Sequence, residues 1–178
     1  MKVLMARHGQ TDSNATGVIQ GQRIDQPLNA EGRRQVEALA AVLASTKIDV
    51  IFSSPLKRAR ETAEIVSRDK NIPIELRKEL MERDFGSLSG KTWDQVENAD
   101  ELKALDKAQN YDYRPLGGES ALGFKKRFLK VVDEIKQGYE RQTVLIVAHA
   151  GILRLAHLLF KETAVQHIGN ASVEEFDV

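Results

Sequence analysis

Residues 143–151 read TVLIVAHAG, a short and almost wholly apolar run that ends in a histidine, an alanine and a glycine. Apolar and β-branched residues in a run of this length are typical of a strand that is buried on both faces of a sheet. A second strand of this kind is predicted over residues 2–6, directly before Arg7, His8 and Gly9. Both strands therefore lead into a histidine.

Further strands and helices alternate along the chain. Strands are predicted over three short runs, residues 49–52, 73–76 and 172–176. Helices are predicted over residues 30–44, 53–69, 119–136 and 151–160. Strands separated by helices imply a mostly parallel sheet that is covered on both faces. The expected fold class is therefore α/β, a three-layer α/β/α sandwich.

Local signals mark the connections between these elements. Residues 53–55, Ser-Ser-Pro, predict a helix that begins with a serine N-cap and a proline at its first position. Residues 9–29 are polar and lack periodicity, so they are predicted to form a long loop. The stretch of about 83–118 is irregular apart from a predicted helix near 92–107. We interpret this stretch as an insertion, a cap segment that could cover a site.

Length, charge and composition restrict the function. A chain of 178 residues is expected to form one domain, here spanning residues 1–178. Its 26 Lys and Arg balance 26 Asp and Glu, which argues against nucleic acid or an anionic membrane as a partner. It holds no cysteine, so disulfide scaffolds, thiolate nucleophiles and cysteine-based zinc sites are excluded. The apolar run at the N-terminus is too short for a signal peptide or a membrane span, so the protein is expected to be cytoplasmic.

Charged and titratable side chains follow the predicted strands at one edge of the sheet. Ligands of open α/β sheets bind outside the carboxyl ends of the strands, where His8 and His149 are expected. Arg7 lies beside His8, and Arg58 lies near the start of a helix whose free N–H groups attract anions. Two guanidinium groups, two imidazoles and a helix N-terminus suit a phosphoryl group. Each residue alone more often has a structural role, and only their convergence favours the functional interpretation.

Short motifs follow one another in the order of a known family. They are residues 7–11 (RHGQT), Asn14, 20–28 (QGQRIDQPL), 53–63 (SSPLKRARETA), 80–90 (LMERDFGSLSG), 118–120 (GES), 149–151 (HAG) and 170–172 (NAS). Over nearly the whole chain, this set resembles the signature of the histidine phosphatase superfamily, the phosphoglycerate mutase-like proteins. The resemblance implies the fold of that family and favours its phosphatase branch.

The resemblance also implies a role for each matching residue. His8 would be the nucleophile that forms a phosphohistidine, and Glu82 would donate a proton to the leaving oxygen. The phosphoryl oxygens would be held by Arg7, Arg58 and His149. Further contacts with the substrate would come from Asn14, Gln20, Gly21 and the backbone N–H of Ala150. No metal and no other cofactor is implied.

Phosphoryl transfer sets conditions on these side chains. Charge spreads over three phosphoryl oxygens, and Arg7, Arg58 and a protonated His149 would neutralise it without a metal ion. A nucleophilic His8 must be neutral, with its other ring nitrogen donating to a local backbone carbonyl. The surrounding positive charge favours this neutral form. Glu82 must keep its proton near the working pH, so a raised pKa is expected for its carboxyl group.

Three functions are compared: a phosphatase, a mutase of the phosphoglycerate type, and a protein that binds phosphorylated ligands without activity. The stretch between Glu82 and Gly118 carries more acidic than basic residues, which disfavours a multiply anionic mutase substrate. The presence of both His8 and Glu82 disfavours a protein without activity. We therefore favour a metal-independent phosphomonoester hydrolase that acts on a small phosphorylated metabolite, of the α-ribazole phosphatase or the broad-specificity type.

The sequence leaves the organic part of the substrate and the oligomeric state open. Trp93, Tyr111 and Tyr113 would either form an aromatic lid over the substrate or pack the cap segment against the rest of the chain. His157 and His167 are assigned structural roles, since one lies within a predicted helix and the other in a loop.

Overall fold

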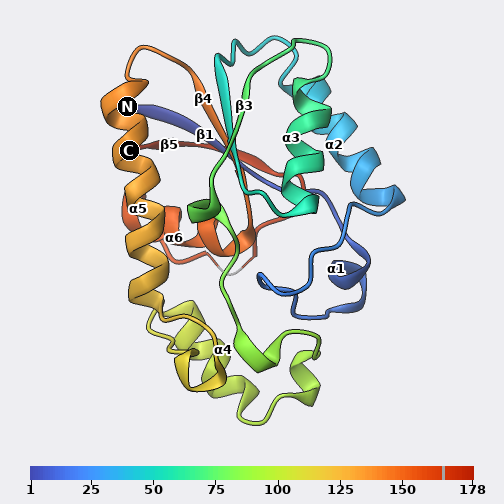
Figure 1. Ribbon diagram of the computed structural model, residues 1–178, viewed down its shortest axis with the longest axis vertical. Coiled ribbons are helices and arrows are strands. Elements are labelled where there is room, and N and C mark those ends of the chain that lie inside the picture. Colours follow the sequence, from blue (N-terminus) through green and yellow to red (C-terminus); the bar gives the residue numbers. More distant parts are fainter. Residues whose placement is uncertain (166) are drawn as a thin grey trace.

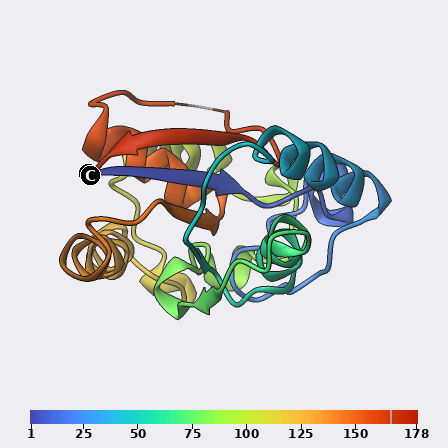
Figure 2. The same ribbon diagram turned by 90° about the horizontal axis from the view of Figure 1, so that it is seen from above.

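A central five-stranded sheet organises the chain in the computed structural model, which describes residues 1–165 and 167–178. The strands are β1 (Lys2–Arg7), β2 (Val50–Ser53), β3 (Ile74–Leu76), β4 (Val144–Ala148) and β5 (Val173–Asp177). Their order is β3-β2-β4-β1-β5, and the neighbouring pairs are parallel except for β1 with β5. Figure 2 shows β1 and β5 side by side, with the C-terminus at one end of this pair. The predicted mostly parallel sheet is confirmed.

Helices cover both faces of the sheet and complete the predicted three-layer sandwich (Figure 1). One face carries α2 (Ala30–Val42) and α3 (Lys57–Ser67), and the other carries α5 (Ala121–Gly138) and α6 (Ala150–Phe160). Each pair of helices buries its own apolar cluster against the sheet. Val36 and Ala59 belong to the first cluster, whereas Phe128 and Ile152 belong to the second.

The register of the sheet brings together strand ends that are far apart in the sequence. β4 lies at the centre, and all of its residues are buried. Arg7 pairs with Ala148 across β1 and β4, and the His8 N–H donates to the Ala148 carbonyl at 3.0 Å. On the other side of β4, the Ser54 N–H donates to the Val147 carbonyl at 3.0 Å. The sheet therefore sets His8, Ser54 and the start of α6 at one edge.

The predicted loop over residues 9–29 contains a short helix, α1 (Asp12–Thr16). Thr11 and Asn14 form a capping box at its start, in which each side-chain oxygen accepts from the backbone N–H of the other residue. A helix of this length is too short to show an apolar period, which is why the sequence pattern did not reveal it.

α3 begins at Lys57, later than predicted. The predicted serine N-cap directly before Pro55 is wrong, because Leu56 is the N-cap of α3, and Ser53 is still part of β2. The Ser54 hydroxyl lies 2.8 Å from Nε2 of His149. Ser53 therefore ends the strand, and Ser54 contacts His149 rather than capping the helix.

The cap segment, residues 83–118, lies at the bottom of Figure 1 together with α4. Its elements, with the turn that precedes them, are η1 (Lys78–Leu80), η2 (Gly86–Leu88), η3 (Trp93–Gln95), α4 (Ala99–Lys107) and η4 (Arg114–Leu116). The helix predicted near 92–107 is interrupted before Ala99, where Asn98 has a left-handed φ of 57°. Within residues 1–165 and 167–178, no helix has both the length and the apolar character needed to cross a bilayer.

Candidate active site

A cavity of about 670 Å³ is lined by residues that follow β1 and β2 and by part of the cap segment. Seven residues that the sequence singled out line it: Arg7, His8, Asn14, Gln20, Gly21, Arg58 and Glu82. His149 and Ala150 do not line it. The His149 ring lies behind His8, with the two ring centroids 5.1 Å apart. Segments distant in sequence therefore meet in one place.

The ring of His8 is buried, and its tautomer follows from its neighbours. Nδ1 lies 2.7 Å from the carbonyl oxygen of Gly9, which can only accept a hydrogen bond, so Nδ1 carries the proton. Nε2 is then unprotonated and accepts from Arg58 Nε at 3.3 Å. Burial, followed by the nearby charges of Arg58 and His149, lowers the pKa of His8 well below its ordinary 6.5. His8 is therefore a neutral imidazole with its lone pair on Nε2.

Two guanidinium groups face the same cavity. Arg58 of α3 is buried and donates to the carbonyls of Gly21 at 2.8 Å and Ile24 at 3.0 Å. Arg7 donates to the Ile168 carbonyl, and its Nε has no partner among the described residues. Burial lowers the pKa of each guanidinium to about 10, which leaves both charged at neutral pH. Arg7 and Arg58 thus each bring a fixed positive charge to the cavity.

His149 follows β4 and is fully buried. Its Nε2 lies 2.8 Å from the Ser54 hydroxyl, whereas its Nδ1 meets no partner in the described part of the chain. Burial, followed by the charges of Arg58 and Arg127, lowers the pKa of His149 well below 6.5. The prediction of a protonated His149 is therefore wrong, because a buried ring among guanidinium groups stays neutral.

The carboxylate of Glu82 is held by two backbone N–H groups. The Arg83 N–H donates to Oε1 at 2.9 Å, and the Gly151 N–H near the start of α6 donates to Oε2 at 3.1 Å. Burial raises the pKa of Glu82, but the Arg83 guanidinium and these two N–H groups outweigh burial, so the pKa lies below 4.5. The predicted raised pKa is wrong, because the charged form is the one that accepts these hydrogen bonds.

The remaining predicted substrate contacts come from the loop around α1 and from the start of α6. Asn14 lines the cavity, and its side-chain oxygen accepts from Asn170 at 3.2 Å. Gln20 is buried, and its Oε1 has no partner among the described residues. The Gly21 carbonyl accepts a hydrogen bond from the Arg58 guanidinium. Ala150 is the first residue of α6, where backbone N–H groups have no acceptor within the helix.

Charged residues in the wall formed by α4 and α6 were not expected from the sequence. Arg83 is buried, donates to the Asp106 carboxylate of α4 and lies 3.5 Å from the Glu82 carboxylate. Arg154 of α6 also lines the cavity and pairs with Asp106 at 3.7 Å. The position of Arg83 next to Glu82 is visible in the sequence. Its pairing with Asp106 depends on the placement of α4, which no local pattern reveals.

Aromatic residues of the cap segment divide between the two predicted roles. Tyr111 and Tyr113 are buried and stacked, with ring centroids 4.8 Å apart, so they pack the cap segment. Trp93 is half-buried and lines the cavity, with its ring edge-on to that of Phe85. Of the three predicted lid residues, Trp93 is therefore the one that reaches the cavity.

The site combines a neutral nucleophile, two fixed positive charges and a carboxylate. These are the parts that transfer of a phosphoryl group to nitrogen requires. In the described part of the chain, no group of three or more His, Cys, Asp or Glu side chains could hold a metal ion. Metal independence stays a prediction, because only activity measurements test it.

Comparisons with known sequences agree with this arrangement. The sequence model of the histidine phosphatase superfamily (branch 1) matches residues 3–178. The metal-independent phosphoserine phosphatase of Arabidopsis thaliana is 34% identical over 178 residues, covering 97% of this chain and 74% of the plant protein. The adenosylcobalamin/α-ribazole phosphatase of Escherichia coli K12 is 29% identical over 163 residues, covering 87% of this chain and 76% of the bacterial protein.

Solved structures share the fold. The Bacillus stearothermophilus protein YhfR matches with a TM-score of 0.88 and 32% identity, covering 99% of this chain and 91% of that one. A mycobacterial glucosyl-3-phosphoglycerate phosphatase in complex with VO3 matches with a TM-score of 0.86 and 30% identity, covering 98% of this chain and 91% of that one. The sheet and its helices are therefore shared with a known phosphatase.

Proposed function

The chain belongs to the histidine phosphatase superfamily (branch 1), and from this membership we propose that it hydrolyses phosphate monoesters through a phosphohistidine on His8. The family and the relatives make it a phosphatase. The individual steps, the substrate and the metal independence belong to the proposal. The observation that carries them is the unprotonated Nε2 of His8, beside the Arg58 guanidinium in a cavity that Glu82 also lines.

In the first step, Arg7 and Arg58 hold the phosphoryl group through their N–H groups. The lone pair of His8 Nε2 attacks phosphorus, so that a P–N bond forms while the bond from phosphorus to the leaving oxygen breaks. Negative charge on the phosphoryl oxygens is stabilised by the two guanidinium groups. His149 lies behind His8 and is neutral in the unliganded protein.

Glu82 supplies the proton that an alkoxide leaving group needs. Its lowered pKa makes the carboxylate the resting form. A phosphate ester bound beside this carboxylate raises the pKa by like-charge repulsion, and an ester that binds as its monoanion brings the proton with it. The proton then passes from Glu82 to the leaving oxygen, and the alcohol departs.

In the second step, water attacks the phosphohistidine while the Glu82 carboxylate accepts a proton from that water. The P–N bond breaks, inorganic phosphate is released, and His8 returns to its neutral form. One nucleophile and one carboxyl group therefore complete the hydrolysis.

The proposed substrate is a small phosphorylated metabolite. The cavity volume of about 670 Å³ exceeds what a phosphoryl group needs and is typical of sites for small organic ligands. Trp93, Lys103 and Arg154 also line the cavity, so they lie where the organic part would bind. Phosphoserine and α-ribazole phosphate, after which two relatives are named, are the first candidates. A panel that adds sugar phosphates and phosphoglycerates, ranked by kcat/KM, selects among them.

Replacing the nucleophile tests the proposal. His8→Ala should abolish the release of nitrophenolate from p-nitrophenyl phosphate in buffer with EDTA, where the unmodified protein turns over. His167→Ala is the matched control, because this histidine is exposed and does not line the cavity. Alkaline quenching followed by mass spectrometry should detect phosphate on His8. Near-normal rates in His8→Ala, with the fold retained by circular dichroism, would refute the nucleophile.

The alternatives give different outcomes. A protein that only binds phosphorylated ligands would show no turnover by the unmodified chain, and a metal-dependent hydrolase would lose activity in EDTA. A mutase would isomerise phosphoglycerate faster than it hydrolyses it.

A further inference from the structure

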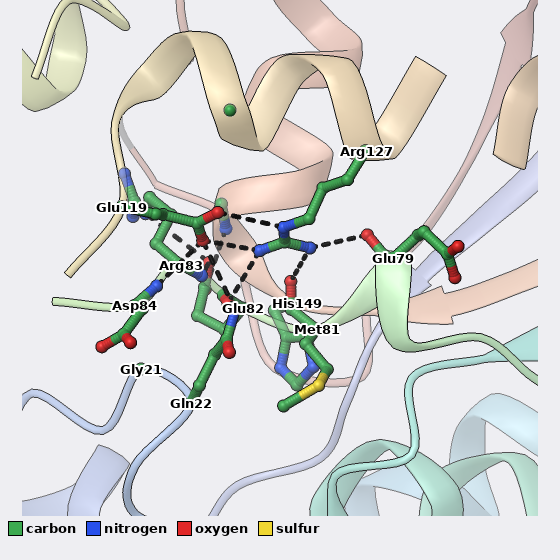
Figure 3. Close-up of polar contacts among 12 residues, drawn as sticks. Gly21, Gln22, Glu79, Met81, Glu82, Arg83, Asp84, Glu119, Arg127 and His149 are labelled. Carbon is green, nitrogen blue, oxygen red and sulfur yellow. Dashed lines mark hydrogen bonds and ion pairs between the residues drawn. The ribbon is translucent and has the colours of Figure 1, made fainter. Parts of the chain in front are cut away.

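Glu82 lies in a stretch of backbone that belongs to neither a helix nor a strand, between η1 and η2. Buried backbone carbonyls in such a stretch need donors from elsewhere in the molecule. Nη1 of Arg127, on α5, donates to the carbonyls of Glu79 and Met81, each at 2.6 Å. Nη2 of Arg127 donates to the Glu82 carbonyl at 3.0 Å (Figure 3). One side chain therefore binds three carbonyls, that of Glu79 in η1 and those of Met81 and Glu82 in the stretch that follows.

Glu119 orients that guanidinium and also binds the backbone that follows Glu82. Its two carboxylate oxygens accept from Arg127, Oε1 from Nη2 at 2.7 Å and Oε2 from Nε at 3.1 Å. Oε1 also accepts from the backbone N–H of Asp84 at 2.9 Å. The pair thus hydrogen-bonds the backbone around Glu82, as Figure 3 shows. Arg127 binds carbonyls up to that of Glu82, and Glu119 binds the N–H of Asp84.

The geometry of this pair requires an arginine. A guanidinium has five N–H donors in a rigid plane. In Arg127, Nε donates to Glu119, Nη1 donates to two carbonyls, and Nη2 donates to one carbonyl and to Glu119. All five N–H donors therefore have an acceptor. A lysine would keep the charge but offers three donors from one point, and it cannot reproduce this planar set.

We propose that Arg127 and Glu119 form a positioning pair that fixes the backbone of Glu82, so that its carboxyl group meets the leaving oxygen. Neither residue lines the cavity, so neither is expected to touch the substrate. Both side chains are mostly buried, which keeps the pair from exchanging its partners with water. This inference rests on the proposed acid role of Glu82 and assigns to a second pair of residues the task of placing it.

The test compares two substrates of similar shape. Nitrophenolate leaves p-nitrophenyl phosphate without needing a proton, whereas phenolate from phenyl phosphate depends more on the acid. We expect Arg127→Lys to lower kcat/KM on phenyl phosphate by about 100-fold, because a displacement of the Glu82 carboxyl by about 1 Å has an effect of this size. The loss on p-nitrophenyl phosphate should be much smaller. That substrate should show a burst of nitrophenolate, because water attack on the phosphohistidine still needs Glu82.

The chain offers a matched control in Arg77, which pairs with a residue of the same helix, α5. Arg77 donates from Nη2 to Glu75 at 2.6 Å and to Glu134 of α5 at 2.7 Å, and its side chain is partly buried like that of Arg127. It does not line the cavity. Arg77→Lys should therefore leave the ratio of the kcat/KM values on the two substrates unchanged, even where it lowers the stability of the protein.

Glu82→Gln separates failure of the inference from failure of the proposed function. If Glu82→Gln and Arg127→Lys both lower kcat/KM on phenyl phosphate much more than on p-nitrophenyl phosphate, the positioning pair is supported. If only Glu82→Gln is selective, the inference is overturned and the acid role stands. If Glu82→Gln loses activity equally on both substrates, the acid role of Glu82 is refuted, and the inference that rests on it is overturned with it. Glu119→Gln is the second variant, and loss of folding in both pair variants but not in Arg77→Lys would assign the pair to stability alone and overturn the inference.

Discussion

At the scale of single residues, Gly151 lies directly against the Glu82 carboxylate. A Cβ at residue 151 would overlap Oε1 of that carboxylate and crowd the Arg83 guanidinium. Gly151→Ala is therefore expected to displace Glu82 and to lower kcat/KM on phenyl phosphate by about 100-fold. Gly138→Ala is the control, because a Cβ at that position would meet no neighbour within 4 Å. Normal kinetics of Gly151→Ala would show that the place of Glu82 does not limit the rate.

His8 and His149 make the free energy of unfolding depend on pH. Both rings are buried with pKa values well below 6.5, whereas the unfolded chain has the ordinary value. Below about pH 6.5 the unfolded state therefore binds more protons, and stability falls as the pH falls from that value toward the lower folded pKa. The expected loss is up to about 1.4 kcal/mol per pH unit for each ring.

Urea unfolding between about pH 7.5 and pH 5.5 measures this dependence, since most carboxyl groups stay ionised over that range. His149→Gln should reduce the slope of stability against pH, because one of the two buried rings is removed. A free energy of unfolding that does not change over the range would contradict the neutral state of both rings.

The positions of the site residues were easier to predict than their ionisation. Arg7, His8 and His149 follow strands that apolar runs reveal, so their arrival at one edge of the sheet could be expected. The Arg83 guanidinium and N–H, followed by the N–H of Gly151, together lower the pKa of Glu82 by more than burial raises it. Arg83 is adjacent in the sequence, but no local pattern shows that its guanidinium is buried beside the carboxylate or that α6 brings Gly151 there, and the expected raised pKa failed for this reason. The catalytic roles themselves stay predictions.

At the scale of elements, one buried ion pair fastens α4 to the stretch that carries Glu82. Asp106→Asn would leave the Arg83 guanidinium buried without its main carboxylate partner. Removing one partner of a buried pair costs about 3–5 kcal/mol, and we expect the cost to appear as faster hydrogen exchange in α4 and as a lower unfolding midpoint. Asp112→Asn, in the exposed pair with Arg114, is the control and should change little. Equal effects of both substitutions would contradict this attachment.

Elements with a long apolar period were predicted to within a few residues. The helix expected over residues 119–136 forms α5 (Ala121–Gly138), because its apolar side recurs over several turns. The start of α3 and the interruption before α4 were not predicted. Both depend on single residues, Ser53 in the sheet and Asn98 with its left-handed backbone, and neither changes a periodic pattern.

At the scale of the whole molecule, the order of strands and the place of the cap segment required the structure. β5 pairs with β1 in the antiparallel direction, and the backbone atoms of Met1 and Val178 hydrogen-bond at 2.8 Å and 3.1 Å. Alternating strands and helices predict a parallel sheet but do not specify which strand lies at the edge. That residues 1–178 form one domain with an inserted cap stays a prediction.

The cavity lies between the edge of the sheet and the cap segment, so a ligand inside it contacts both. Vanadate mimics a five-coordinate phosphoryl transition state, and in EDTA it should inhibit the protein by binding beside Arg58. At about 100 times its Kd, such a ligand adds about 2.7 kcal/mol of stability, which raises the Tm of a chain of this size by about 5–10 °C. Trp93 is the one tryptophan of the chain and lines the cavity, so its fluorescence should report the same Kd.

Two variants separate the parts of that prediction. Trp93→Phe should lose the fluorescence signal but keep the rise in Tm, because the indole is not expected to hold the anion. Arg58→Met should lose both the inhibition and the rise in Tm, because the guanidinium beside Nε2 of His8 is gone. Vanadate that raises the Tm of Arg58→Met as much as that of the unmodified protein would place the anion elsewhere. The sheet edge and the cap segment would then not form a single phosphoryl site.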